Sequence, residues 1–149
     1  MQIETALAQR SHTGSDHQSE TLFLDDGIFA VASGKGGPDG GLSVARMALA
    51  CVRDQGAELS ELRAAARGGA PEAKLALLDA LGAVFLEATT RLHGDSRGMA
   101  SMSLAALAGK RLFIAHVGNT RIDLLRSGRL ARLSLDHSVA AERVRRGLM

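Results

Sequence analysis

The sequence lacks tryptophan and tyrosine, and it has only four phenylalanines in 149 residues. Proteins that hold single-stranded nucleic acids stack the bases on such rings. No zinc-finger or basic-zipper spacing is present either. We therefore expect no nucleic-acid partner.

Cysteine is almost absent as well, because Cys51 is the only one and cannot form a disulfide within the chain. Its neighbours from Met47 to Val52 are mostly apolar, which favours a buried thiol over a nucleophile. No apolar run approaches the roughly 20 residues that span a bilayer, and residues 1–14 are too polar for a signal peptide. These absences predict a cytoplasmic protein without a membrane partner.

Acidic residues are scarce at the C-terminal end of the chain, and basic residues are scarce at the N-terminal end. The 18 Lys and Arg nearly balance the 16 Asp and Glu, but from Lys110 onward nine basic residues face three acidic ones. Before Gly27 one arginine faces five acidic residues. The length and the 46% hydrophobic content predict one globular domain over residues 1–149.

The first part of the chain predicts strands followed by helices. The stretch TLFLDDGIFAVAS (21–33) predicts a hairpin that turns at Asp25-Asp26-Gly27, and a weaker pattern over 3–9 predicts another strand. Helical spacing then predicts a helix with Leu42, Ala45, Leu49 and Val52 on its buried side, which residues 58–67 continue beyond Gly56.

A second helix is predicted to begin at Pro71, with a buried stripe formed by Leu75, Leu78, Phe85 and Leu92. From residue 99 on, four short segments predict a meander of antiparallel strands. Its turns are expected at Gly109-Lys110, Gly118-Asn119 and Ser127-Gly128.

A last helix is expected after Asp136 or Ser138 as N-cap. Within this region His116 is expected to be a packed strand residue, and His137 a residue of the helix cap. Strands, helices and strands in this order indicate an α+β fold.

The glycine-rich loop VASGKGGPDGG (31–41) allows two interpretations. A phosphate-binding Walker loop has the pattern G-x-x-x-x-G-K-[ST], but here Lys35 precedes Gly36-Gly37 and no Ser or Thr follows it. The dinucleotide pattern G-x-G-x-x-G fails at Asp39. Lys35 and the free amides of the loop nevertheless leave an anion-binding or nucleotide-binding loop as one hypothesis. The other interpretation is a former metal-binding loop.

Three segments support the second interpretation, because together they resemble the PPM (PP2C-type) family of metal-dependent serine/threonine phosphatases. LFLDDGIFAVASGKGGPDGGLSVA is similar to that family's LFVVADGMGGHxxGExAS, and TGSDHQSETLFL is similar to its GxxRxxNEDxxx. The run from GMASMSLAALAG through AHVGNTR to DHS is similar to its GTTxxxA, AHVGDSR and DHS motifs. The segments occur in the family's order and cover nearly the whole chain.

The resemblance implies a PP2C-like α-β-β-α sandwich of antiparallel sheets flanked by helices, with two Mn²⁺ or Mg²⁺ ions that generate the hydroxide for phosphate-ester hydrolysis. It places Glu20 at a metal-binding aspartate and Gly34 at a glycine whose carbonyl binds metal. Ser33, however, stands where the family has the aspartate that bridges both ions. The family's later CSDGL and DN segments have no counterpart before Met149, so we expect the N-terminal part of the fold, incomplete at the C-terminus.

We therefore expect a phosphatase-like module with lost or weak activity that binds or regulates in a phospho-signalling pathway. Its partner would be a phosphoprotein or a kinase-pathway protein, and exposed sheet edges predict self-association. One alternative is an active Mn- or Mg-dependent phosphatase, or a fragment of one. The other is an anion or nucleotide binder that uses Lys35. No catalytic residue is assigned, and no cofactor is expected if the activity is lost.

Overall fold

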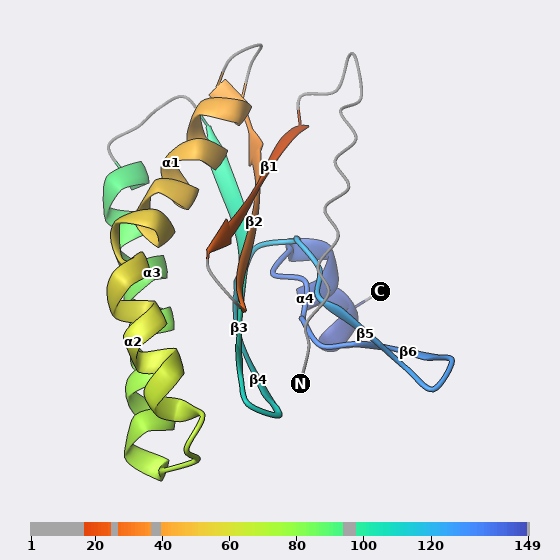
Figure 1. Ribbon diagram of the computed structural model, residues 1–149. Coiled ribbons are helices and arrows are strands. Elements are labelled where there is room, and N and C mark those ends of the chain that lie inside the picture. Colours follow the sequence, from red (N-terminus) through yellow and green to blue (C-terminus); the bar gives the residue numbers. More distant parts are fainter. Residues whose placement is uncertain (1–16, 25–26, 37–39, 94–97, 149) are drawn as a thin grey trace.

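Four antiparallel strands form the main sheet, and three helices cover one of its faces (Figure 1). The computed structural model describes residues 17–24, 27–36, 40–93 and 98–148, with the main chain alone for 17–24. The sheet has the order β1-β2-β3-β4, formed by β1 (His17–Leu24), β2 (Ile28–Lys35), β3 (Met99–Ala108) and β4 (Arg111–Val117). The helices are α1 (Gly40–Asp54), α2 (Gly56–Ala66) and α3 (Pro71–His93). The predicted α+β class is confirmed.

The predicted hairpin is present as β1 and β2, which pair from His17 opposite Lys35 to Leu24 opposite Ile28. Gly27 precedes β2 with a φ of +130°, a conformation that side chains other than glycine rarely adopt. Asp25 and Asp26 of the predicted turn lie outside the described residues, as does the strand predicted over 3–9.

Alternate residues of the central strands face the helices, as the period of two in a strand requires. On β2 these are Ile28, Ala30 and Ala32, all buried. The small alanines let α1 pack closely, and α1 buries the predicted Ala45, Leu49 and Val52 against them. Cys51 is also buried, and its thiol donates to the Met47 carbonyl at 3.4 Å, so the predicted buried thiol is confirmed.

Helix α3 begins at Pro71 as predicted, but the predicted stripe is wrong. The side that packs on the core carries Leu77, Leu81, Val84 and Ala88. Leu75 is 60% exposed and Leu78 is 43% exposed, while Phe85 and Leu92 pack at the margin of the core. Apolar residues occupy more than one side of α3, so their spacing alone could not show which side meets the other elements.

The predicted meander is only partly correct. β3 and β4 pair across a turn in which Gly109 has a φ of +64°. β5 (Asp123–Arg126) and β6 (Arg129–Arg132) also pair, with positive φ at Ser127 and Gly128, but they form a separate two-stranded sheet. The chain leaves the main sheet after β4 at Gly118, whose φ is +95°.

Helix α4 (Val139–Arg145) ends the described chain and lies with β5 and β6 beyond the side of the main sheet that the helices leave uncovered (Figure 1). Ser138 is its N-cap, since its hydroxyl accepts a hydrogen bond from the Ala141 amide at 3.1 Å. The described part of the chain thus forms one helical layer, one main sheet and the small β5–β6 ribbon. The described residues form no second large sheet. Membrane crossing is not supported by any described helix, since none combines the required length and apolarity.

Candidate functional site

The predicted metal loop lies at the end of β2. Ser33 is half-buried, Gly34 is buried and Lys35 is exposed. Gly34 has a packing reason to be glycine, because an added Cβ would lie 2.7 Å from Val44 Cγ2 and even closer to the Gly41 carbonyl. The start of α1 therefore rests directly on Gly34.

The strand register shows what lies beside Ser33. Its partner on β1 is Ser19 and its partner on β3 is Ser101, so three serines form a row across the sheet. Glu20 pairs with Ala32, one position away from this row. Across both registers, therefore, Ser33 is paired with hydroxyl residues and with no carboxylate.

The described residues do not fit the two-metal centre that the resemblance implies. Hydroxyl groups lack the negative charge with which carboxylates hold hard cations such as Mg²⁺. Among the residues whose side chains are described, no three His, Cys, Asp or Glu come together in a way that could hold a metal ion. Metal ligation by Glu20 and Gly34, and phosphate binding by Lys35, remain predictions from the sequence.

A polar network lies near Ser33 on the sheet face away from the helices. The Ser103 hydroxyl on β3 lies 3.0 Å from His116 Nδ1 on β4 and 2.7 Å from Thr120 Oγ1. His116 Nε2 lies 3.0 Å from the Leu135 carbonyl, which can only accept. In the neutral imidazole Nε2 therefore carries the proton and Nδ1 accepts, so that Ser103 donates to Nδ1 and accepts from Thr120.

This network resembles the serine–histidine pair of a nucleophilic enzyme only in that a serine hydroxyl is hydrogen-bonded to a histidine. The Ser103 side chain is buried beneath its partners, with 3% of its surface exposed. A nucleophile must reach its substrate, so the buried hydroxyl serves to connect β3, β4 and the segment before α4. His116 is thus a packed strand residue, as expected.

A second set of contacts fixes the end of β4 to the segment that leads into α4. The His137 amide donates to the Gly118 carbonyl at 2.8 Å, and the Gly118 amide approaches His137 Nδ1 at 3.4 Å. The rings of His116 and His137 lie 5.1 Å apart. Ser101 Oγ accepts from the Asn119 amide at 3.2 Å and so holds the bend that follows β4. The turn predicted at Gly118-Asn119 between two paired strands is wrong, because β4 and β5 do not pair.

An ion pair reinforces this junction. Arg121 Nη2 lies 2.9 Å from Asp136 Oδ2. The hydrogen bond from Arg121 lowers the pKa of the Asp136 carboxyl below its ordinary value. Asp136 therefore pairs with arginine, and Ser138 alone caps α4.

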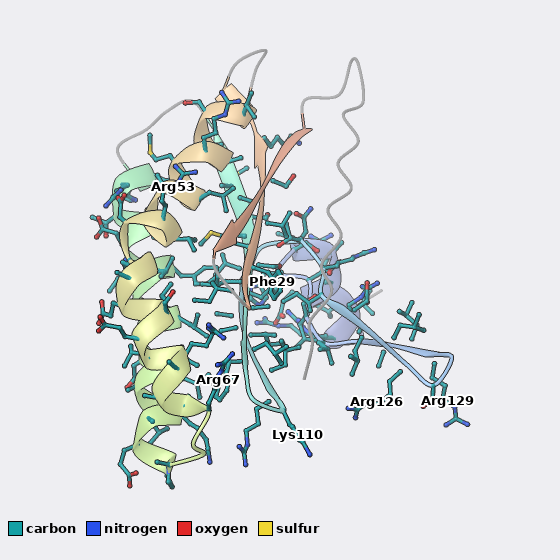
Figure 2. All side chains as sticks on the ribbon, in the orientation of Figure 1. Phe29, Arg53, Arg67, Lys110, Arg126 and Arg129 are labelled. Atoms are coloured by element: carbon teal, nitrogen blue, oxygen red, sulfur yellow. The ribbon has the colours of Figure 1, made fainter. Side chains whose placement is uncertain are left out.

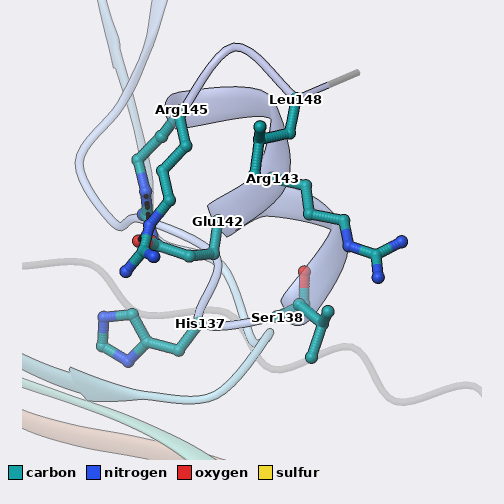
Figure 3. Close-up of a pocket in the computed structure, with 8 residues that line it drawn as sticks. His137, Ser138, Glu142, Arg143, Arg145 and Leu148 are labelled. Atoms are coloured by element: carbon teal, nitrogen blue, oxygen red, sulfur yellow. Dashed lines mark hydrogen bonds and ion pairs between the residues drawn. The ribbon is translucent and has the colours of Figure 1, made fainter.

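A shallow pocket of about 500 Å³ lies beside α4, and no sequence motif indicated it (Figure 3). Glu142 lies between the guanidinium groups of Arg145 and Arg146 and accepts from both. These hydrogen bonds lower the pKa of the Glu142 carboxyl. The pocket also borders His137, Ser138, Val139, Arg143 and Leu148. Glu142 offsets one of the three guanidinium charges of Arg143, Arg145 and Arg146, so the pocket keeps a net positive charge.

Comparison with known proteins gives structural matches alone, since neither a family model nor a curated protein matches the sequence. The serine/threonine phosphatase PstP/Ppp of Mycobacterium tuberculosis is 18% identical and covers 89% of this chain and 59% of its own, with a TM-score of 0.63. A PstP catalytic domain in complex with two manganese ions is 18% identical and covers 89% of this chain and 60% of its own, with a TM-score of 0.54. The chain has a PPM-type phosphatase fold.

PppA of Pseudomonas aeruginosa, a key regulatory component of the T6SS, has the same fold. It is 24% identical and covers 89% of this chain and 62% of its own, with a TM-score of 0.59. The chain spans about three fifths of these PPM-type structures. The predicted PP2C-like architecture, incomplete in extent, is thereby confirmed.

Proposed function

We propose that this chain is a PPM-type phosphatase-like module that binds a phosphoprotein or a kinase-pathway protein in the cytoplasm and has lost efficient phosphate-ester hydrolysis. The two-metal reaction of this fold needs bridging carboxylates that hold both ions. The observation that carries the proposal is Ser33, which offers a neutral hydroxyl where the family resemblance expects the bridging aspartate.

The neighbours of Ser33 support the same proposal. Ser19 and Ser101 flank it in the strand register, and neither supplies the missing charge. Gly34 on β2 lies directly against Gly41 and Val44 of α1, so it has a structural role that does not require a metal. The fold would then present a surface to phosphoproteins without turning them over.

The proposal extends to self-association. β1 and β4 are the edge strands of the main sheet, and edges without cover tend to pair with another strand. Size measurement of the purified chain over a range of concentrations tests this part separately, because a chain that stays monomeric at all of them would exclude it.

The test of the main proposal combines calorimetric titration with Mn²⁺ and turnover of a phosphoserine peptide. We expect neither two-site Mn²⁺ binding in the micromolar range nor turnover that depends on the metal. The variant Ser33→Asp should increase Mn²⁺ affinity over the wild type, because it restores a carboxylate. Ser60→Asp, which places a carboxylate at a half-buried serine on α2, is the matched control.

One result would overturn the proposal in favour of an active phosphatase: Mn²⁺-dependent turnover by the wild type that Glu20→Ala removes. This measurement uses Mn²⁺ because the structurally similar PstP catalytic domain was solved with two manganese ions. Nucleotide protection against thermal melting that Lys35→Ala abolishes would instead establish the anion-binding loop.

A further inference from the structure

The β5–β6 ribbon extends away from the rest of the molecule, and Arg126 and Arg129 lie at its far end (Figure 2). All eight strand residues are exposed, and among the described elements the two strands contact chiefly each other. A two-stranded hairpin alone is at best marginally stable in water. The ribbon is therefore a surface that gains from a partner.

The two faces of the ribbon differ in chemistry. Leu125 and Leu130 are directly opposite each other and are 68% and 70% exposed, so they form an apolar pair on one face. Opposite side chains share a face and neighbours along a strand alternate. The other face therefore carries Arg126 opposite Arg129, next to Leu124 and Ala131.

The charges of the ribbon point to an acidic partner. Asp123 neutralises Arg132, with Oδ1 and Nε 2.7 Å apart. Within the described residues the side chains of Arg126 and Arg129 make no hydrogen bond or ion pair, and like charges directly opposite each other destabilise a strand pair. A carboxylate between them would remove this repulsion.

The outer edges of β5 and β6 add a third feature. The small sheet has only these two strands, so each has one edge that no described strand pairs with. An extended peptide can add to such an edge through main-chain hydrogen bonds, while alternate side chains reach the two faces.

We propose that the β5–β6 ribbon binds an extended peptide in which acidic and apolar residues alternate. The apolar side chains pack on Leu125 and Leu130, and the acidic side chains meet Arg126 and Arg129. This interaction does not depend on metal binding or phosphate hydrolysis, so its test is separate from that of the proposed function.

The test measures fluorescence anisotropy of a labelled peptide in which glutamate and valine alternate. The wild-type chain should bind it more tightly than a peptide of the same composition with the residues in two blocks. Reversing both tip charges, Arg126→Glu with Arg129→Glu, should weaken binding by about tenfold or more. The matched control reverses the charges of Arg53 on α1 and Lys110 in the β3–β4 turn, two exposed cations away from the ribbon, and should leave the affinity unchanged (Figure 2).

A second measurement keeps the test valid if the double variant unfolds, as circular dichroism would show. The alternating peptide with a photo-crosslinking residue should attach to residues 123–132 of the wild-type chain. Equal affinity for the alternating and block peptides, or attachment elsewhere, would overturn the proposal.

Two further results would also overturn the proposal, because each would identify a different partner of the β5–β6 ribbon. Concentration-dependent dimerisation that the Arg126→Glu, Arg129→Glu variant abolishes, without peptide binding, would identify a second copy of the chain. Binding to phosphatidylglycerol vesicles without peptide binding would identify a membrane surface.

Discussion

The Ser103 hydroxyl on β3 donates to Nδ1 of His116 on β4, across a separation of 3.0 Å. The same imidazole reaches the Leu135 carbonyl through its other nitrogen. One side chain thus joins the main sheet to the segment that carries α4, although the two belong to no common sheet. Buried polar groups that are fully hydrogen-bonded specify such junctions.

Replacement of Ser103 by alanine should destabilise the protein. It removes the hydroxyl that His116 Nδ1 and Thr120 Oγ1 share, and leaves these two atoms only their 3.5 Å contact with each other. The loss of a hydrogen-bond partner by partly buried groups of this kind costs about 1–3 kcal/mol. The free energy of unfolding in urea measures the loss. Thr89→Ala, which removes an exposed hydroxyl bonded to the Phe85 carbonyl, should change it by less than about 0.5 kcal/mol. Equal effects of the two substitutions would contradict the role given to Ser103.

Gly34→Ala tests the contact between β2 and α1. The added methyl group overlaps Gly41 and Val44, and overpacking of this kind costs about 1–3 kcal/mol. Gly82→Ala is the control, because a Cβ there meets nothing within 4 Å and alanine favours the helix by about 0.5–1 kcal/mol. Thermal melting should shift down for the first variant and up for the second. A neutral Gly34→Ala would show that α1 does not rest on this residue.

The orientation of α3 can be tested with two leucines. Leu81 is fully buried and Leu75 is 60% exposed. Leu81→Ala should lower the free energy of unfolding by about 2–5 kcal/mol, the usual range for buried leucine. Leu75→Ala should change it by less than about 0.5 kcal/mol, as expected of an exposed position. A larger loss of stability for Leu75→Ala than for Leu81→Ala would support the buried stripe predicted from the spacing.

The Arg121–Asp136 ion pair predicts a loss of stability in acid. The folded pKa of Asp136 lies below its unfolded value, so the pair contributes fully above an unfolded pKa of about 3.9. That contribution is lost as the pH falls through the folded pKa. The difference in unfolding free energy between wild type and Asp136→Asn should therefore be present at neutral pH and shrink in acid. Asp79→Asn on α3 is the control, and a pH-independent difference for Asp136→Asn would contradict the prediction.

Much of the fold could be predicted because its signals are local. The turn at Gly109, the helix start at Pro71 and the cap at Ser138 each follow from residues close in sequence. The errors concern long-range packing. Which side of α3 meets the core and whether β5 joins β4 depend on partners far along the chain, which spacing does not encode.

The candidate site divides in the same way. Ser33 and Gly34 were found because they lie in one short motif. The link between Ser103, His116 and Leu135 brings together three distant segments, and no local sequence pattern indicated that they meet. The cross-strand pair of Arg126 and Arg129, by contrast, follows from the turn predicted at Ser127-Gly128, because these two residues flank it.

The strand order also has a consequence for the path of folding. β1–β2 and β3–β4 are hairpins of neighbouring segments, whereas the central pairing of β2 with β3 encloses all three helices of the covering layer. Hairpins form within about 1–10 microseconds. Closing a long connection is slower, because the chain loses conformational entropy before the distant strands make stabilising contacts. The two halves of the sheet should therefore form early and separately. The slow step is their union, when β2 meets β3 beneath a helical layer that both halves share.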